Sequence, residues 1–317
     1  MRILGEYGRE DLAKVYVAAM RDGGRHVVEF VESLQPPIPR DRKWVLILSS
    51  SFGCPIACRM CDAGGGYAGR LEAEEITAQA DYMVRRRFPD GKVPVAKFKV
   101  QFARMGEPAL NPAVLDALRL LPRTFDAPGL MACVSTIAPA GTEAFFDALT
   151  GIKDELYANG RFQLQFSVHT TDEAKRDWLI PGRKWDFNRI ARFGESFRAD
   201  GDRKITLNFA LARDLPVDPW VIANAFDPET FLVKLTPLNP TARTRENGLE
   251  SAFDPDDVGP CEGLVRDFRG LGFEAFVSAG ESEENRIGSN CGQYVSTLEG
   301  PTLAVRKEYE TLSYRLG

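Results

Sequence analysis

Three cysteines fall within eight consecutive positions of this 317-residue chain, and their spacing is its most informative chemical feature. Cys54, Cys58 and Cys61 follow the pattern C-x3-C-x2-C. A tight loop of this length brings three sulfur atoms within reach of one metal centre. Iron–sulfur clusters normally take four cysteine ligands. With three nearby thiols, either a distant residue completes the set or one iron keeps an open position at which substrate chemistry can occur.

Two other interpretations compete with an iron–sulfur cluster. The three thiols could bind zinc together with His26 or His169, the only histidines in the chain, or they could be unrelated. Zinc ribbons usually pair their ligands two and two, so the spacing favours iron and sulfide. The other cysteines, Cys133, Cys261 and Cys291, are scattered singly and by themselves suggest small buried side chains.

Composition indicates an ordinary soluble globular protein, with 44% hydrophobic and 27% charged residues. Lys and Arg number 40 against 45 Asp and Glu, so no general positive field draws the chain to nucleic acid. Six cysteines are too few for a disulfide framework. No apolar run approaches the roughly 18 residues of a membrane span, and the N-terminus lacks the apolar core of a secretory signal. We therefore expect a cytoplasmic protein with no membrane partner.

Short apolar or alternating runs recur between longer helical patterns. The expected strands are Trp44–Leu48, Ala96–Phe102, Met131–Ser135, Phe162–Val168, Lys204–Leu211, Thr230–Leu235 and Phe273–Val277. The expected helices are Ala73–Phe88, Pro112–Leu121, Thr142–Leu149, Asp186–Arg198, Asp218–Phe226 and Asp256–Gly270.

Regular alternation of strands and helices predicts an α/β fold with parallel strands, which we interpret as a partial (β/α)6-type barrel. No glycine fingerprint follows the first strand, which argues against the competing doubly wound sheet. An alternating segment, Lys14–Glu29, with a turn at Gly23–Gly24, predicts an N-terminal β-hairpin extension. We expect a hairpin and linker at 1–43, the barrel at 44–296 and a tail at 297–317.

Polar, small and sulfur-bearing residues follow the expected strands at their carboxyl ends. The segments are CPIACRMC, ARMGEP, STIAP, SVHTT and TPLNP. In a parallel barrel this rim collects the binding and catalytic groups, so the sequence predicts a site there.

The segment CPIACRMC resembles the signature of the radical SAM superfamily, with Met60 at a position that is usually aromatic. The resemblance implies that Cys54, Cys58 and Cys61 hold a [4Fe–4S] cluster. Its fourth iron would bind the amino and carboxylate groups of S-adenosylmethionine (SAM), and electron transfer would release a 5′-deoxyadenosyl radical. A reducing partner of the flavodoxin or ferredoxin type is implied as well.

Six ordered segments, from about Lys43 to Tyr294, resemble one branch of that superfamily, the RlmN- and Cfr-type adenosine C-methyltransferases of ribosomal RNA. They are SSSFGCPIACRMCDAG, MGEPALNP, VST, FSVHTTDEAKRDWLIP, TPLNP and SNCGQY. From the residues alone, these polar side chains also suit helix-terminal and turn positions. The resemblance implies contacts of Gly106 and Glu107 with the SAM amino group, of Ser135 and Ser167 with its ribose or carboxylate, and of Asn239 with its adenosine portion.

Cys291 lies in SNCGQY and matches the cysteine that this branch methylates with one SAM. In the branch, a radical from a second SAM then removes a hydrogen from the S-methyl group, and the resulting S–CH2 radical attacks an sp2 carbon of adenine. The resemblance therefore implies that Cys291 is catalytic. A buried thiol is the alternative that the residue alone suggests.

A second cysteine of the branch, seven residues before the first cluster cysteine, resolves the covalent adduct by forming a disulfide. Ile47 occupies that position here. An aliphatic side chain forms no disulfide, so this route is closed. Cys133, near the end of its expected strand, is better placed than Cys261 to substitute for that second cysteine. The alternative is that Cys133 is only a buried cysteine of the core.

The expected substrate differs from that of the branch, whose helical RNA-engaging domain precedes the barrel. Only 53 residues precede Cys54, and the net charge is −5. We therefore favour a small molecule or free nucleotide with an unsaturated ring carbon, and keep RNA as the alternative. Glu29 and Glu32 lie about where the branch places an acid near the target base. Basic patches at 85–87, 183–184 and 243–245 are interpreted as solvated faces.

Three hypotheses follow. The first is a radical SAM methyltransferase that uses Cys291. The second is a radical SAM enzyme with a non-methylating outcome. The third is a non-catalytic iron–sulfur or zinc protein.

Overall fold

The computed structural model describes residues 1–22, 24–291, 294–295, 298–299 and 304–305. Gly23 of the expected turn and most of the expected tail at 297–317 lie outside the described residues. The strands are β1 (Arg2–Gly8), β2 (Ala13–Ala19), β3 (Val27–Ser33), β4 (Trp44–Leu48), β5 (Ser51–Cys54), β6 (Gly65–Arg70), β7 (Phe98–Phe102), β8 (Leu130–Thr136), β9 (Phe162–Ser167), β10 (Ile205–Leu211), β11 (Phe231–Pro237), β12 (Glu274–Val277), β13 (Leu298–Glu299) and β14 (Ala304–Val305).

Helices connect the strands of the barrel. The α-helices are α1 (Ala73–Arg87), α2 (Ala113–Thr124), α3 (Glu143–Leu156), α4 (Glu173–Leu179), α5 (Phe187–Phe197), α6 (Pro219–Ala225), α7 (Ala242–Glu246), α8 (Glu262–Gly270) and α9 (Ser282–Ile287). Short 3-10 helices lie at Pro108–Leu110 and Gly259–Cys261. Among the described residues, none of the helices combines the length and the hydrophobicity that a membrane-spanning segment needs.

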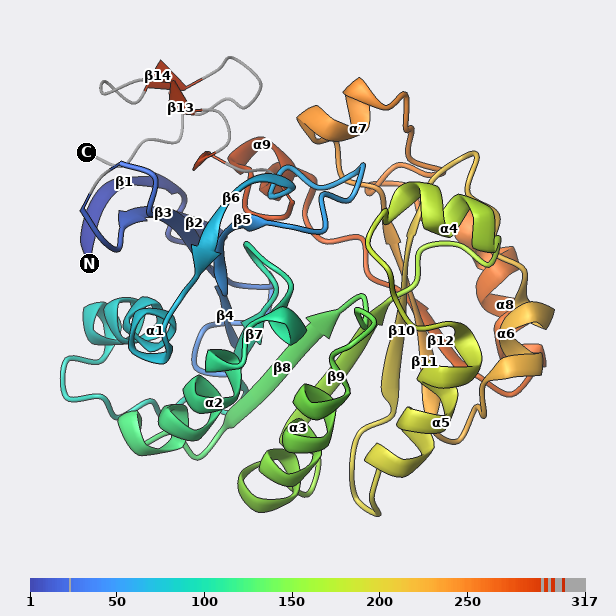
Figure 1. The fold of residues 1–317 in the computed structure, drawn as a ribbon, viewed down its shortest axis with the longest axis horizontal. Helices are drawn as coiled ribbons and strands as arrows, with labels where there is room; N and C mark the ends of the chain where they lie inside the picture. Colours follow the sequence, from blue (N-terminus) through green and yellow to red (C-terminus); the bar gives the residue numbers. More distant parts are fainter. Residues whose placement is uncertain (23, 292–293, 296–297, 300–303, 306–317) are drawn as a thin grey trace.

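A single ten-stranded sheet organises the molecule, in the order β1-β2-β3-β4-β7-β8-β9-β10-β11-β12. From β4 to β12 all neighbouring strands of this sheet are parallel and follow chain order. This order excludes the doubly wound competitor, in which the strand order reverses at a switch point. Figure 1 shows the sheet curving with β4 and β7 on one side and β10–β12 on the other. No pairing closes it among the described strands, and the predicted partial barrel is confirmed.

Strands β7 to β11 each have an apolar face and a more polar face. On β7, Phe98, Val100 and Phe102 are buried in the core beneath the helices, so Lys99 and Gln101 point to the opposite, inner face of the curved sheet. The same alternation holds along the other strands. Polar or sulfur-bearing residues of the inner face are Lys99, Gln101, Cys133, Ser135, Gln163, Gln165, Ser167, Thr206, Asn208, Lys234 and Thr236.

The N-terminal extension is larger than a hairpin. β2 and β3 form the expected antiparallel pair, and β1 adds a strand to β2. β3 in turn pairs with β4, where Val31 lies opposite Ile47, so the extension continues the sheet of the barrel. The proposed division of the chain at residue 43 stays a prediction.

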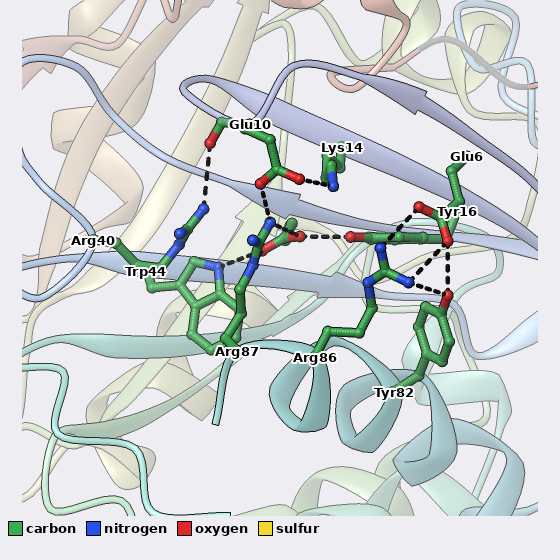
Figure 2. Close-up of polar contacts among 10 residues, drawn as sticks. Glu6, Glu10, Lys14, Tyr16, Arg40, Trp44, Tyr82, Arg86 and Arg87 are labelled. Carbon is green, nitrogen blue, oxygen red and sulfur yellow. Dashed lines mark hydrogen bonds and ion pairs between the residues drawn. The ribbon is translucent and has the colours of Figure 1, made fainter. Parts of the chain in front are cut away.

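A polar network fixes this extension on α1 (Figure 2). The Arg87 guanidinium lies 2.9 Å from a Glu32 carboxylate oxygen, and Arg86 lies 3.2 Å from Glu6. The Glu32 carboxylate also accepts hydrogen bonds from the Tyr16 hydroxyl at 2.5 Å and the Trp44 indole at 3.1 Å. Two arginines of the basic patch at 85–87 therefore bind carboxylates of the extension, which corrects its interpretation as a merely solvated face.

Candidate metal and cofactor site

The three clustered cysteines are carried by a hairpin that the sequence did not reveal. β5 and β6 form a separate two-stranded antiparallel sheet, in which Cys54 lies opposite Gly65. Cys58 and Cys61 lie in the connecting loop, where the Cys61 N–H donates to the Cys58 carbonyl at 3.1 Å. The β5 segment SFGC has a single large apolar residue, Phe52, and does not stand out as a strand, which is why the loop was expected to follow β4 directly. The hairpin joins the two ends of the loop and gathers the thiols.

The thiols sit in surroundings that resist ionisation. Burial raises the pKa of Cys54 to about 11 and that of Cys61 to about 12. Burial also raises the pKa of Cys58 well above its usual value, and the neighbouring charges of Cys61 and Cys54 add to the effect. Three adjacent thiolates therefore need a strong cationic partner. A metal cluster supplies that charge, so the donor set fits one.

The spacing of these donors does not suit a single ion. Among the described residues, no three His, Cys, Asp or Glu side chains converge closely enough to bind one metal ion. Two sulfurs on one zinc lie about 3.8 Å apart, given Zn–S bonds of about 2.3 Å in tetrahedral geometry. In a cubane cluster each cysteine binds a different iron, which allows wider separations.

Neither histidine joins the cysteines. The His26 ring packs edge-on against Phe52 with centroids 4.9 Å apart, and its Nδ1 lies 3.2 Å from the Asp22 carbonyl. Buried His169 accepts a hydrogen bond at Nδ1 from the Ala210 N–H at 3.1 Å. Burial lowers the pKa of His169 to about 3. The zinc site completed by a histidine is therefore not supported.

Helix α7 anchors the cysteine loop. The Asp62 carboxylate accepts from the Arg243 N–H at 2.9 Å, and the Arg243 guanidinium donates to the Gly64 carbonyl at 3.0 Å. The Thr241 hydroxyl donates to the Met60 carbonyl at 2.9 Å. In the basic patch at 243–245, Arg243 thus holds the loop, a role that sequence reasoning missed because the two segments are about 180 residues apart.

Gly106 packs against the strand that carries Cys54. Its φ is +98°, and a Cβ there would lie 2.1 Å from the Ser51 hydroxyl oxygen. The neighbouring Met105 carbonyl accepts from the N–H groups of Ser50 and Ser51 at 2.7 and 3.2 Å. Only glycine permits this approach. The structure thus gives Gly106 a packing role, and its contact with SAM stays a prediction.

Glu107 is a buried carboxylate that lacks a cationic partner among the described residues. It accepts from the N–H groups of Ala109 and Ile137 at 3.1 and 3.0 Å and from the Thr136 hydroxyl. Burial raises its pKa to about 7. Its charge also raises the pKa of Cys54, so it lies near the cysteine loop. A buried carboxylate in this state fits an ammonium group such as that of SAM.

The predicted serines lie on the inner face at the carboxyl ends of their strands. The Ser135 hydroxyl accepts from the Gln101 amide at 3.3 Å. Ser167 lies beside Asn208 in register on β10, and the buried Asn208 Oδ1 has no hydrogen-bond partner in the described structure. Sequence reasoning missed Asn208. Its signal was a polar residue at an inward position of an otherwise apolar strand, and its orphaned oxygen fits a ligand donor.

Asn239 and Cys291 meet at this rim. The Asn239 amide donates to the Cys291 sulfur at 3.1 Å. The Cys291 side chain is exposed, but protein atoms surround its thiol. The loss of hydration raises the pKa of this thiol, whereas the hydrogen bond from Asn239 lowers it. The charge of Cys291 in turn raises the pKa of Cys61, so the two thiols are close. Gly292 and Gln293 of the motif lie outside the described residues.

A buried ion pair holds the segment that carries Cys291. The Arg104 guanidinium lies 2.6 Å from the Glu29 carboxylate, and both side chains are almost fully buried. Arg104 also donates to the carbonyls of Ser289 and Asn290, each at 2.9 Å. Glu29 accepts from the Tyr294 N–H at 2.7 Å. The ion pair therefore binds the backbone on both sides of Cys291. Sequence reasoning missed Arg104, because nothing local distinguishes it from a surface arginine.

The expected role of Glu29 or Glu32 at a target base is wrong. Glu29 is committed to Arg104 and to backbone N–H groups, and Glu32 to Tyr16, Trp44 and Arg87. Both carboxylates are buried, and neither lies free to meet a substrate.

A cavity of about 720 Å³ lies between the β2–β3 turn and the cysteine hairpin. Its lining includes Arg25, Phe52, Asp62, Tyr67 and Met105. Because Asp62 directly follows Cys61, the cavity adjoins the cysteine loop. It has room for a small molecule beside the candidate metal site.

Comparison with known proteins was made by sequence and by structure, and no family model matches the chain. A probable dual-specificity RNA methyltransferase RlmN of Cutibacterium acnes is 31% identical over 291 residues, covering 84% of this chain and 67% of the relative. The protein of the same description from Salinispora tropica is 27% identical over 306 residues, covering 92% and 77%. A crystal structure of a radical SAM methyltransferase from Sphaerobacter thermophilus superposes with a TM-score of 0.70 at 22% identity, covering 92% of this chain and 80% of that one, and shows the same fold.

The identity to the Cutibacterium acnes relative, 31% with 67% of that protein covered, is sufficient to assign a family. The chain belongs to the RlmN family of radical SAM methyltransferases, whose cofactors are a [4Fe–4S] cluster and SAM.

Proposed function

We propose that this enzyme methylates an unsaturated ring carbon of a small molecule or nucleotide, using Cys291 to carry the methyl group. The observation that supports the proposal best is the position of Cys291. Its sulfur accepts the Asn239 hydrogen bond at 3.1 Å, close to the cysteine loop and exposed at the rim. A carrier thiol needs this combination of accessibility and proximity to the cofactors.

The residues around the cofactors have distinct roles in the proposal. The cluster and SAM, when bound, supply an electron, a methyl group and a carbon radical. Cys54, Cys58 and Cys61 are the thiolate ligands of the cluster. The Glu107 carboxylate accepts hydrogen bonds from the SAM ammonium group, which is supported by its burial without a cation. Gly106, Ser135, Ser167 and Asn239 bind the remainder of SAM.

Cys291 accepts a methyl group at sulfur as a thiolate. The Asn239 amide stabilises that thiolate by donating to it, and the Arg104–Glu29 pair keeps the segment in place. Radical chemistry is needed because an electron-poor ring carbon does not attack an electrophilic methyl donor. Cys291 therefore presents its S-methyl group to the radical and then to the ring.

Release of product needs a residue other than the one at position 47. Ile47 is half-buried on β4 and packs near Tyr294 and Val295 in an apolar cluster. Cys261 lies in the core beneath the helices, away from the inner face. Cys133 is buried on β8 among the residues of the inner face. We therefore retain Cys133 as the thiol that could resolve the adduct.

Two basic patches that could have suggested RNA are engaged within the protein. Arg86 and Arg87 bind Glu6 and Glu32, and Arg243 binds the cysteine loop. This supports a small molecule or nucleotide as the substrate. RNA is the second candidate, favoured by the RNA methyltransferase description of the relatives. A flavodoxin- or ferredoxin-type electron donor and a cytoplasmic location complete the proposal, because a reducing compartment keeps such thiols reduced.

Isotope labelling tests the carrier. The anaerobically reconstituted enzyme is incubated with SAM bearing a CD3 methyl group and a reductant, and the peptide containing Cys291 is analysed by mass spectrometry. We expect a CD3 group on Cys291 together with 5′-deoxyadenosine. Cys291→Ala should still cleave SAM without methylating any substrate, whereas Cys261→Ala should behave as the parent. Deoxyadenosine formation with an unmodified Cys291 would instead support the non-methylating hypothesis.

A second experiment separates the substrate classes. The enzyme is offered a small-molecule extract or ribosomal RNA, each with CD3-labelled SAM. We expect the label in a low-molecular-weight product. Label recovered only in nucleosides from digested RNA would transfer the assignment to RNA.

A further inference from the structure

Four lysines that no motif includes lie on the inner face of the barrel or at the amino ends of its strands. Lys43 directly precedes β4, Lys97 directly precedes β7, Lys99 is the second residue of β7, and Lys234 lies in the middle of β11. β4 and β7 are neighbours, with Val45 opposite Lys99 in register. Lys43, Lys97 and Lys99 thus form one group at the amino ends of two adjacent strands.

Lys234 faces this group from the opposite wall. On β11, Phe231, Val233 and Leu235 are buried in the core beneath the helices, so Lys234 points inward, as Lys99 does on β7. Figure 1 shows the curved sheet placing β7 and β11 on opposite sides of the barrel. Burial and then the charge of Lys99 lower the pKa of Lys234 to about 8. Two lysines separated by three intervening strands therefore act on each other across the interior.

The inner-face lysines have no neutralising partner. The ammonium groups of Lys97, Lys99 and Lys234 make no hydrogen bond or salt bridge with any described residue, and that of Lys43 donates only to the neutral side chain of Gln35. All four are half-buried. The other buried or half-buried lysines of the described residues have partners. Three bind carboxylates, namely Lys14 to Glu10, Lys153 to Asp202 and Lys184 to Asp177, and Lys204 donates to the Pro228 carbonyl at 2.8 Å.

Leaving these cations unpaired is costly. Burial and then repulsion from Arg203, Lys43 and Lys99 lower the pKa of Lys97 to about 8. Partly desolvated like charges destabilise the folded protein unless an anion compensates them. The structure retains the group although a neutral side chain at any of the four positions would relieve the repulsion. An anionic ligand accounts for its presence.

The group also reaches the proposed site of methylation. The charge of Lys234 lowers the pKa of Cys291, and Cys291 in turn raises the pKa of Lys234. Asn239, which donates to the Cys291 sulfur, lies five positions after Lys234 in the chain. A ligand whose anionic group contacts the lysines can therefore extend along β11 toward Cys291.

We infer that Lys43, Lys97, Lys99 and Lys234 form a binding site for a phosphate or diphosphate group of the substrate. That the ligand is the substrate rests on the proposed function, whereas the site itself rests on the lysines alone. A phosphorylated small molecule fits better than an RNA strand, because the lysines line the interior of the barrel, where a polymer with phosphates at every nucleotide has little access. The ammonium groups bind the phosphate oxygens as point charges.

Inorganic pyrophosphate is the probe that tests the site. Binding to the cluster-containing enzyme, without SAM, is measured by isothermal titration calorimetry. We expect at least a tenfold loss of affinity in Lys99→Gln and in Lys234→Gln. Lys92→Gln changes an exposed lysine outside the group and should bind as the parent does. Equal affinity in all four proteins, or no binding to the parent, would overturn the inference.

Thermal unfolding gives a readout that does not depend on activity. Because the substitutions remove unpaired charge, Lys99→Gln and Lys234→Gln should melt at the parent temperature or higher without ligand. Pyrophosphate should raise the melting temperatures of the parent and Lys92→Gln more than those of Lys99→Gln and Lys234→Gln. A lower melting temperature in both variants, together with unchanged pyrophosphate binding, would make the lysines structural and contradict the site. Lys234→Arg should retain most of the affinity.

Two further outcomes separate the site from its proposed use. Pyrophosphate binding that the variants weaken, in an enzyme whose Cys291 is never methylated, would support the site and reject the proposed function. A single-stranded RNA oligonucleotide that binds more tightly than pyrophosphate and loses affinity in the same variants would assign the site to RNA and overturn the small-molecule inference.

Discussion

The side-chain amide of Asn239 donates a hydrogen bond to the sulfur of Cys291 at 3.1 Å, across 52 positions of the sequence. The contact joins the loop that follows β11 to the segment that follows α9. It gives the thiol a donor that stabilises its ionised form, which is the form that accepts a methyl group. Asn239 therefore touches the proposed carrier directly, in addition to its predicted contact with SAM.

Removing this donor should raise the pKa of the Cys291 thiol, because burial already raises it and the Asn239 hydrogen bond opposes that effect. In Asn239→Ala, we expect alkylation of Cys291 by iodoacetamide to slow at neutral pH and its pH profile to shift to higher pH. Mass spectrometry of the Cys291 peptide measures the rate. Asn188→Ala, an exposed position on α5, should leave the profile unchanged. Coincident profiles for Asn239→Ala and the parent would contradict the prediction.

Substitution of any one cluster cysteine should remove the metal. Cys54→Ala, Cys58→Ala and Cys61→Ala each remove one of the three proposed thiolate ligands, so we expect iron content after anaerobic reconstitution to fall to a small fraction of the parent value. Iron analysis and visible absorption measure the loss. Cys261→Ala is the matched control, since Cys261 is buried in the core beneath the helices. Parental iron content in all three loop variants would exclude the assigned ligands.

The free energy of unfolding of the cluster-free protein should fall as the pH rises, because of Glu107. Burial raises the pKa of Glu107 from 4.5 to about 7 in the folded protein. Between these two pH values the carboxyl group ionises in the unfolded chain but stays protonated in the folded protein, so the free energy of unfolding falls as the pH rises. The loss is complete once the pH exceeds the folded pKa. The loss approaches about 3 kcal/mol, at 1.36 kcal/mol per pKa unit. Urea unfolding across this range measures it.

Glu107→Gln should flatten that dependence, since its amide does not titrate. Asp116→Asn, at an exposed position on α2, should keep the parent slope. The prediction would be contradicted if the stability of the parent rose from pH 5 to 7 and Glu107→Gln reduced that rise. Such a result would show that Glu107 is paired with a cation in the cluster-free protein.

Breaking the Arg104–Glu29 ion pair should strongly destabilise the folded protein. Arg104→Met leaves a fully buried carboxylate without its cation and frees the carbonyls of Ser289 and Asn290. We expect the free energy of unfolding to fall by about 3–5 kcal/mol. The exposed Arg119–Asp116 pair supplies the control, because Arg119→Met should cost less than about 1 kcal/mol. Denaturant unfolding of both variants compares the two costs, and similar losses would contradict the positioning role of Arg104.

The local hydrophobic patterns of the sequence were sufficient to predict most strands and helices of the barrel. Strands such as Phe162–Ser167 and helices such as Phe187–Phe197 match their expected ranges closely, because a two- or four-residue period shows directly which side chains are buried. The elements β5, β6, α4 and α7 were missed, because their sequences SFGC, GGYAGR, EAKRDWL and ARTRE contain few apolar residues that would mark a buried face. The expected helix at 256–270 begins later, at Glu262, after a 3-10 turn.

The sequence by itself determined the family motifs, the C-x3-C-x2-C cysteines and the alternation of strands and helices, because each depends on residues that are close together in the chain. Tertiary structure alone decided which distant residues meet. It placed Asn239 on Cys291, committed Glu29 to Arg104 and set Lys234 opposite Lys99. The physical reason is that strand alternation specifies the face on which a side chain lies, whereas the curvature of the sheet determines what it faces across the barrel.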